Sequence, residues 1–272
     1  MLKKKNYIII SLIIVGVLIF PLTNFLIDNT VKASDPLKVG ATPVPHAEIL
    51  KHIKGKLASV GVEIEIVEFN NYVTPNLALA DGSIDANFFQ HVPYLNQFKN
   101  DRNLDLTYTV KVHIEPYALY SNKIEDVENL PQGAEIAIPN DPSNEARALQ
   151  ILHQEGLIKL NDPKNLKATP LDIVDNPNDF KFKELEAAQL PRVLADVDAA
   201  FINTNYALEA DLNPVKDALL IEDKESPYAN VLAVRKGEEN DFGIRMLSKF
   251  LTSNLAKTFI EENYGGSIVP AF

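Results

Sequence analysis

The feature that most constrains the fold is a repeated alternation of short strand patterns with helix patterns. A buried strand at Leu37–Ala41 precedes a helix with apolar residues about every fourth position. The alternation starts a second time after Gly133, where Ala134–Ile138 has a strand pattern and Asp141 is placed to cap the next helix. Two runs of this kind predict an α/β protein with two lobes.

The order of these patterns also predicts where the chain passes between the lobes. We expect crossings near His113–Tyr120 and Glu225–Asn230. Residues 34–116 together with 229–272 would then form lobe 1, and residues 117–228 would form lobe 2. Two crossings make a hinge, and ligands of such folds bind between the lobes, at the carboxyl ends of strands.

The first 33 residues have the pattern of an export signal. Three lysines, Lys3 to Lys5, precede an apolar run from Tyr7 to Ile27, and Val31 and Ala33 are small residues at the positions that a signal peptidase requires. An uncleaved anchor is the alternative, because the run is as long as the ~20 residues that span a bilayer. Both interpretations place the folded part outside the cytoplasm, either associated with the membrane at the cell surface or secreted after cleavage.

Charge and cysteine content exclude several classes of function. The full chain has 26 basic and 37 acidic side chains, and residues 1–33 contain four lysines and one aspartate. The remainder therefore has 22 basic and 36 acidic side chains and a net charge of −14. Such an acidic surface disfavours binding to nucleic acid or to anionic lipid. Because the chain has no cysteine, disulfides, thiolate metal sites and cysteine nucleophiles are excluded.

The stretch Asn87–Tyr94 gathers aromatic rings, carboxamides and an imidazole directly after a predicted strand. Phe88 and Phe89 must point to opposite faces of that strand, so we assign Phe88 to the core and Phe89 to the cleft. Together with Tyr72, these rings would suit a thioether or another apolar side chain. The alternative is a core cluster at a strand–helix junction, in which His91 has a purely structural role.

A second group of polar residues begins the helix that follows Asp141. Asn144 and Arg147 lie one turn apart on the same face. The guanidinium could grip a carboxylate through two parallel hydrogen bonds. The alternative is an exposed arginine paired with Glu145 or Asp141.

Three asparagines form a further group of candidate ligand contacts. Asn203 and Asn205 come after a buried strand, and Asn230 follows Ser226–Ala229. A carboxamide can accept from an ammonium group and donate to a carboxylate, so these residues suit a free amino acid. Turn formation is the alternative, and it is the stronger one for Asn205.

Motifs of catalysis are missing from the sequence. It has no Gly-x-Ser-x-Gly, P-loop, dinucleotide-binding or His-Glu-x-x-His motif. The five histidines are dispersed, and only His46 and His52 have a spacing that suits a shared metal. We therefore expect no catalytic residues, no cofactor and no metal, and predict a binding protein rather than an enzyme.

Short motifs along the chain occur in the order that one family of bacterial proteins has them. Over residues 37–272 the sequence resembles the methionine-binding, NlpA-type lipoproteins of ABC importers. The resemblance is carried by Gly40–Thr42, Pro45–Leu50, Tyr72–Asn76, Asp85–His91, Pro93–Leu95, Ile138–Asp141, Asn144–Leu149, Gly156–Leu160, Glu186–Arg192, Ile202–Ala207 and Ser226–Asn230.

The resemblance implies a two-lobed type II periplasmic-binding-protein fold with two hinge crossovers. It implies a receptor that captures L- or D-methionine, or a methionine-containing dipeptide, between the lobes and delivers it to a permease with a cytosolic ATPase. The motif match assigns residues around the ligand side chain and residues that hold its backbone groups. The first are Tyr72, Phe89, His91 and Tyr94, and the second are Asn144, Arg147, Asn203 and Asn230.

The sequence departs from the family pattern at two points. Family members usually have a lipid-carrying cysteine after the signal, and this chain has none. Asn71 stands where an aspartate commonly precedes the tyrosine, which affects the rim of the pocket. The missing cysteine suggests, as an alternative, an adhesion or signalling module that has lost transport. An extracellular enzyme on the same scaffold is a second alternative, because a fold does not fix function.

Overall fold

The structure is a computed structural model that describes residues 35–223 and 226–272. The predicted leader, residues 1–33, and part of the second predicted crossing lie outside the described residues. No helix in the described part of the chain is long and apolar enough to cross a membrane.

A six-stranded sheet forms the centre of the first lobe, in the order β13-β4-β12-β3-β1-β2. Strands β1 to β3 pair in parallel, whereas β12 runs antiparallel between β3 and β4 and β13 runs antiparallel beside β4. The strands are β1 (Leu37–Ala41), β2 (Ile64–Glu68), β3 (Ala86–His91), β4 (Leu106–Ile114), β12 (Ala229–Arg235) and β13 (Val269–Pro270).

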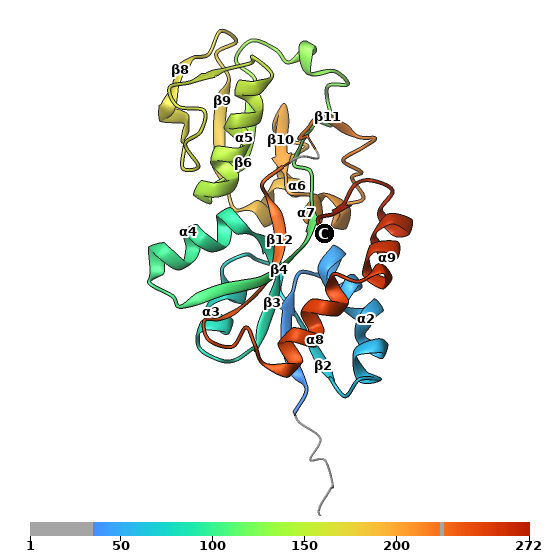
Figure 1. The fold of residues 1–272 in the computed structure, drawn as a ribbon. Helices are drawn as coiled ribbons and strands as arrows, with labels where there is room; N and C mark the ends of the chain where they lie inside the picture. Colours follow the sequence, from blue (N-terminus) through green and yellow to red (C-terminus); the bar gives the residue numbers. More distant parts are fainter. Residues whose placement is uncertain (1–34, 224–225) are drawn as a thin grey trace, which may run out of the picture. The chain divides into compact units, whose positions relative to one another are not determined.

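Helices cover both faces of this sheet (Figure 1). On one face lie α2 (Glu48–Ala58), α8 (Phe242–Leu251) and α9 (Asn254–Tyr264), and on the other lie α3 (Thr74–Ala80) and α4 (Val92–Arg102). Strand β12 has buried apolar residues on both sides because it is covered twice. Its alternate residues Leu232 and Val234 pack into one apolar cluster, and Val231 and Ala233 pack into the other.

A five-stranded sheet forms the centre of the second lobe, in the order β11-β5-β10-β6-β9. Helix α5 packs on one face, and α6 and α7 pack on the other (Figure 1). The strands and helices are β5 (Ala118–Tyr120), β6 (Glu135–Pro139), α5 (Pro142–Gln154), β9 (Lys181–Leu185), α6 (Leu190–Val193), β10 (Ala199–Ile202), α7 (Thr204–Glu209) and β11 (Ala218–Ile221).

Short elements complete the chain. A two-stranded ribbon is formed by β7 (Lys159–Leu160) and β8 (Ile173–Asp175). The single helical turns are η1 (Pro43–Ala47), η2 (Val127–Asn129), η3 (Pro170–Asp172) and η4 (Ala187–Gln189).

The chain passes from the first sheet to the second between β4 and β5 and returns between β11 and β12. The predicted two-lobed α/β fold is thereby confirmed, while the residue bounds assigned to each lobe stay a prediction. The predicted start of α5 is also confirmed, because the Asp141 side chain accepts from the Asn144 N–H and Pro142 is the first helical residue.

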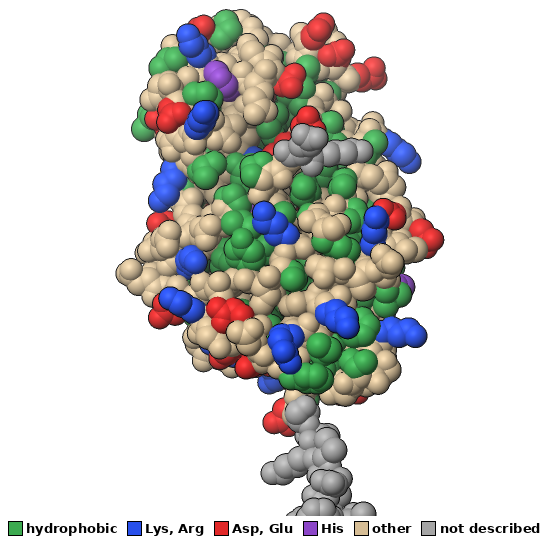
Figure 2. All heavy atoms as spheres, viewed as in Figure 1, with side chains coloured by type: hydrophobic (Ala, Val, Ile, Leu, Met, Phe, Trp, Pro, Cys, Tyr) green, Lys and Arg blue, Asp and Glu red, His purple; other side chains and the backbone are tan. Residues whose placement is uncertain are grey.

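Charge is dispersed on the face of the molecule that Figure 2 draws. On the face drawn in Figure 2, lysine and arginine side chains are scattered among acidic and apolar ones. That face has no continuous basic patch of the kind that marks a nucleic-acid-binding surface.

Candidate functional site

The residues predicted to bind a ligand line one cavity. All eight of them do so, together with Gln90, Glu115, Thr204 and Asn205. The cavity has a volume of about 20 Å³, which is room for about one water molecule. An amino acid would therefore enter only after the surrounding groups move apart. A larger groove of about 640 Å³ shares Tyr72 and Tyr94 with this cavity.

His91 stands where β3 ends and α4 begins, and it caps the helix. Its Nδ1 accepts from the Tyr94 N–H at 3.1 Å, so the proton is on Nε2, which donates to Asn144 Oδ1 at 3.1 Å. Burial, and then the nearby Arg147 guanidinium, lower the pKa of His91 to about 3. The imidazole is therefore neutral at physiological pH.

Aromatic rings form one wall of the cavity. The ring centroid of Tyr72 lies 5.9 Å from that of Phe89 and 5.8 Å from that of Tyr94. The hydroxyl of Tyr72 donates to Asn205 Oδ1 at 2.5 Å, and that of Tyr94 donates to the Tyr72 carbonyl at 2.9 Å. The polar ends of both tyrosines are satisfied, so their rings are left for apolar contact. The prediction that Phe88 packs in the core while Phe89 faces the cleft is confirmed.

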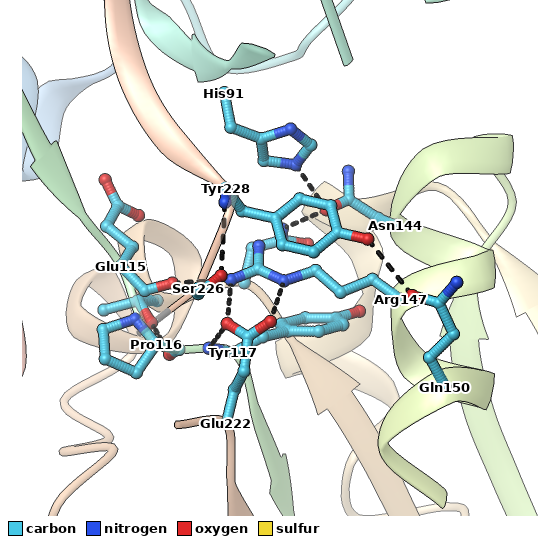
Figure 3. A network of polar contacts seen from close by, with 12 residues as sticks. His91, Glu115, Pro116, Tyr117, Asn144, Arg147, Gln150, Glu222, Ser226 and Tyr228 are labelled. Carbon is cyan, nitrogen blue, oxygen red and sulfur yellow. Dashed lines mark hydrogen bonds and ion pairs between the residues drawn. The ribbon is translucent and has the colours of Figure 1, made fainter. Parts of the chain in front are cut away.

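Arg147 is buried and has two sets of partners (Figure 3). Its Nε donates to Glu222 Oε1 at 3.0 Å and its Nη2 donates to the other oxygen of the same carboxylate. Nη2 also donates to the Glu115 carbonyl at 2.9 Å. The guanidinium carbon lies 4.2 Å from the ring centroid of Tyr228 and 5.0 Å from that of Tyr117.

These contacts settle how Arg147 is paired. The alternative of an exposed arginine with Glu145 or Asp141 is wrong, since its carboxylate partner is Glu222, just after β11. Among the described residues, no hydrogen bond uses Nη1 of Arg147.

The carboxamides leave polar atoms unsatisfied. Asn144 Oδ1 accepts from His91 and from Asn203 Nδ2, the latter at 2.9 Å, while Asn144 Nδ2 donates to Asp141. Asn203 Oδ1 and Asn205 Nδ2 are buried without a partner among the described residues. One acceptor and one donor on residues that line a cavity match the two charged ends of a zwitterion.

Three cavity residues were not predicted as ligand contacts: Gln90, Thr204 and Glu115. Asn205 was interpreted as a turn residue, yet it lines the cavity. Glu115 is a buried acid in the stretch between β4 and β5, and its position directly before Pro116, at the predicted crossing, was the available signal.

His46 and His52, the two histidines whose spacing would suit a shared metal, belong to different groups of contacts. His52 stacks on Phe259 with ring centroids 4.3 Å apart, whereas His46 is buried beside His113 and Glu115. Within the described residues, His46, His113 and Glu115 are the only group placed to share a metal ion.

These features define a class of protein. Two α/β lobes joined by two crossings, with a cavity between them lined by aromatic rings and unsatisfied polar atoms, make a two-lobed solute-binding protein.

The chain belongs to the NlpA lipoprotein family, whose sequence model matches residues 37–272. It is 39% identical to the D-methionine-binding lipoprotein MetQ of Yersinia pestis over 263 residues, which are 95% of this chain and 97% of that protein. It is 40% identical to the methionine-binding lipoprotein MetQ of Bacillus subtilis over 237 residues, which are 85% and 86% of the two chains. The structure of a nutrient-binding protein from Burkholderia cenocepacia bound to methionine matches with a TM-score of 0.84 and 45% identity, over 87% of this chain and 100% of that one. The predicted resemblance is confirmed.

Proposed function

We propose that this protein is the extracytoplasmic receptor of an ABC importer, which captures methionine between its lobes and delivers it to a membrane permease. The observation that carries the proposal is the pair of unsatisfied polar atoms, Asn203 Oδ1 and Asn205 Nδ2, on residues that line the same cavity as the aromatic wall. The names of the relatives and the methionine-bound neighbour support this ligand.

Each part of the cavity suits one part of methionine. The rings of Tyr72, Phe89 and Tyr94, with His91, would surround the thioether. Asn144, Arg147, Asn203 and Asn230 would hold the charged backbone groups. L-methionine, D-methionine and a dipeptide that contains methionine all present these groups.

Thermal unfolding tests the proposal. Residues 34–272, refolded from denaturant to remove bound ligand, would be melted with L-methionine, D-methionine, glycyl-methionine and leucine. Binding to the folded state alone raises the free energy of unfolding by about 2.7 kcal/mol at a hundredfold excess over Kd. We expect a shift with at least one methionine compound and a smaller one with leucine. A shift with leucine and none with any methionine compound would contradict the proposal.

The hydrogen bonds of the cavity residues argue against an enzyme. The Thr204 hydroxyl donates to the Pro116 carbonyl at 2.5 Å, and His91 Nε2 donates its N–H to Asn144 Oδ1, so these two residues do not form a nucleophile–base pair. We infer a binding protein, and an assay for hydrolysis of methionine esters and dipeptides would detect turnover if the enzyme alternative held. A receptor that binds methionine but has no permease to dock on would favour the signalling alternative.

We also propose that the leader, or contact with the permease, keeps the protein at the membrane outside the cytoplasm. The chain has no cysteine for lipid attachment, so the apolar run Tyr7–Ile27 would serve as the anchor unless it is cleaved. Cell fractionation should find the protein with membranes, or in the medium after cleavage at Ala33. A mainly cytosolic protein would refute this.

A further inference from the structure

A buried carboxylate with no predicted role, Glu115, faces the ligand cavity. It lies between β4 and β5, at one of the two crossings between the sheets, and is 7% exposed. Its side chain lines the cavity beside Asn203, Asn205 and Asn230. A charged group in this position needs partners that balance the cost of burial.

Two N–H groups donate to this carboxylate. Nε2 of His113 lies 2.8 Å from Glu115 Oε1, and the backbone N–H of Asn205 donates to Oε2 at 3.2 Å. Nε2 of His46 lies 3.2 Å from Oε1, but its hydrogen bond is with Asn230 Oδ1, at 3.4 Å. Nδ1 of His46 lies 2.7 Å from Thr42 Oγ1, which can donate to it and so leave the imidazole proton on Nε2. His46 can then donate from Nε2 to Asn230 Oδ1.

The charges agree with this arrangement. Burial lowers the pKa of His46 to about 4, so His46 adds no positive charge at neutral pH. Burial acts to raise the pKa of Glu115, but His46, His113 and Arg147 outweigh it and hold that pKa below its usual value. Arg147 in turn is paired with Glu222. The cavity is therefore lined by an ionised carboxylate.

A metal ion in the group His46, His113 and Glu115 fits the geometry less well. Ligand atoms around a tetrahedral zinc ion are about 3.3 Å apart, with the ion between them. Here Nε2 of His113 and Oε1 of Glu115 are 2.8 Å apart, which is the distance of a direct hydrogen bond. The cavity reaches Glu115 but neither histidine.

We propose that Glu115 determines specificity by receiving the positively charged amino group of the bound amino acid. This rests on the proposed function and assigns an orientation to the ligand within it. A carboxylate has about four acceptor positions. One on Oε1 and one on Oε2 are used by hydrogen bonds, which leaves one on each oxygen. With the unpartnered Asn203 Oδ1 on the same cavity, these make three acceptors, which match the three N–H bonds of an ammonium group.

The test compares methionine with its deaminated analogue, in which hydrogen replaces the amino group. The parent protein should bind methionine at least about thirtyfold more tightly than the analogue, since the analogue leaves a buried charge without its partner. Glu115→Gln should weaken methionine binding by about the same factor and change binding of the analogue less than about threefold. The matched control is Glu145→Gln, which alters a buried carboxylate away from the cavity and should leave both affinities unchanged.

His113 is a positioning residue in this scheme, and rescue distinguishes that role from simple packing. His113→Gln can still donate an N–H to Glu115 and should retain most of the preference for methionine over the analogue. His113→Phe fills the site without a donor and should lose most of that preference while it binds the analogue as the parent does.

Several outcomes would overturn the proposal. One is a parent protein that binds methionine and the analogue within threefold, a result that needs no variant to fold. Others are equal losses for both ligands in Glu115→Gln, or stoichiometric zinc binding that Glu115→Gln and His113→Gln both abolish. A parent that binds no methionine at all would instead refute the proposed function, and this assignment with it.

Discussion

Replacing Arg147 by alanine should affect stability and ligand binding through different atoms, so the two effects can be separated. Its Nε and Nη2 are bonded to Glu222, whose side chain is 10% exposed, while that of Arg147 is 3% exposed. Removing the guanidinium leaves the Glu222 carboxylate buried without its partner. Breaking a buried ion pair in this way costs about 3–5 kcal/mol of unfolding free energy. Lost contact with the rings of Tyr117 and Tyr228 adds to that cost.

Binding should fall for another reason. If Arg147 Nη1 meets the ligand carboxylate, Arg147→Ala removes one partner of a buried charge pair, which costs about 2–5 kcal/mol, or at least about thirtyfold in Kd. Arg147→Lys should recover only part of this, because an ammonium group has no planar fork. The double variant Arg147→Ala/Glu222→Gln removes the stranded charge, so its stability should recover in part while its affinity stays low.

Urea unfolding of ligand-free protein measures the stability of each variant, and calorimetric titration measures its affinity for methionine. Methionine methyl ester is the ligand control, because it lacks the carboxylate and its weaker binding should be insensitive to residue 147. If the double variant binds methionine nearly as well as the parent, Arg147 serves only to neutralise Glu222. Near-equal affinities for the parent and Arg147→Ala would remove Arg147 from the site.

Two further predictions concern stability alone. Burial and neighbouring acids, Glu184 first, raise the pKa of Glu145 to about 7, so the free energy of unfolding should fall as the pH rises from about 4.5 to 7. In urea titrations Glu145→Gln should remove about 1–2 kcal/mol of that fall, and the same pH dependence in the variant and the parent would contradict this prediction. Gly40→Ala would place a Cβ 2.7 Å from Ile84 Cδ1 and 2.9 Å from Phe69 Cε2, and should lower the free energy of unfolding by about 1–3 kcal/mol. Gly55→Ala, in open space on a helix, should raise the free energy of unfolding by about 0.5–1 kcal/mol, and equal effects at both positions would refute this interpretation.

Local periodicity explains what the sequence predicted correctly. The opposite directions of Phe88 and Phe89 follow from the two-residue period of a strand. The shared face of Asn144 and Arg147 follows from the period of a helix, and both line the cavity. These relations join residues at most a few positions apart, so they need no knowledge of how the lobes pack.

Contacts between distant residues could not be obtained in this way. Glu222 is 75 positions from Arg147, and His46 reaches Glu115 from another element of the fold. With so many acidic residues in the chain, no sequence pattern selects these two as partners. Strand β9 was also missed, because its sequence Lys-Phe-Lys-Glu-Leu lies at a sheet edge with no buried residue, and alternation of exposed charges is a weak signal.

The same polar atoms that would bind a ligand also hold the closed cavity together. The bond from His91 to Asn144 joins the end of β3 in the first sheet to α5 on the second, and that from Tyr72 to Asn205 makes a similar link to α7. A ligand that replaces these bonds gains only the difference between its own contacts and those it displaces. On the proposed function, methionine would supply partners for Asn203 Oδ1 and Asn205 Nδ2 and would make apolar contact with the rings. Affinity should therefore depend most on those unsatisfied atoms, and Asn203→Ala should weaken binding more than it weakens the fold.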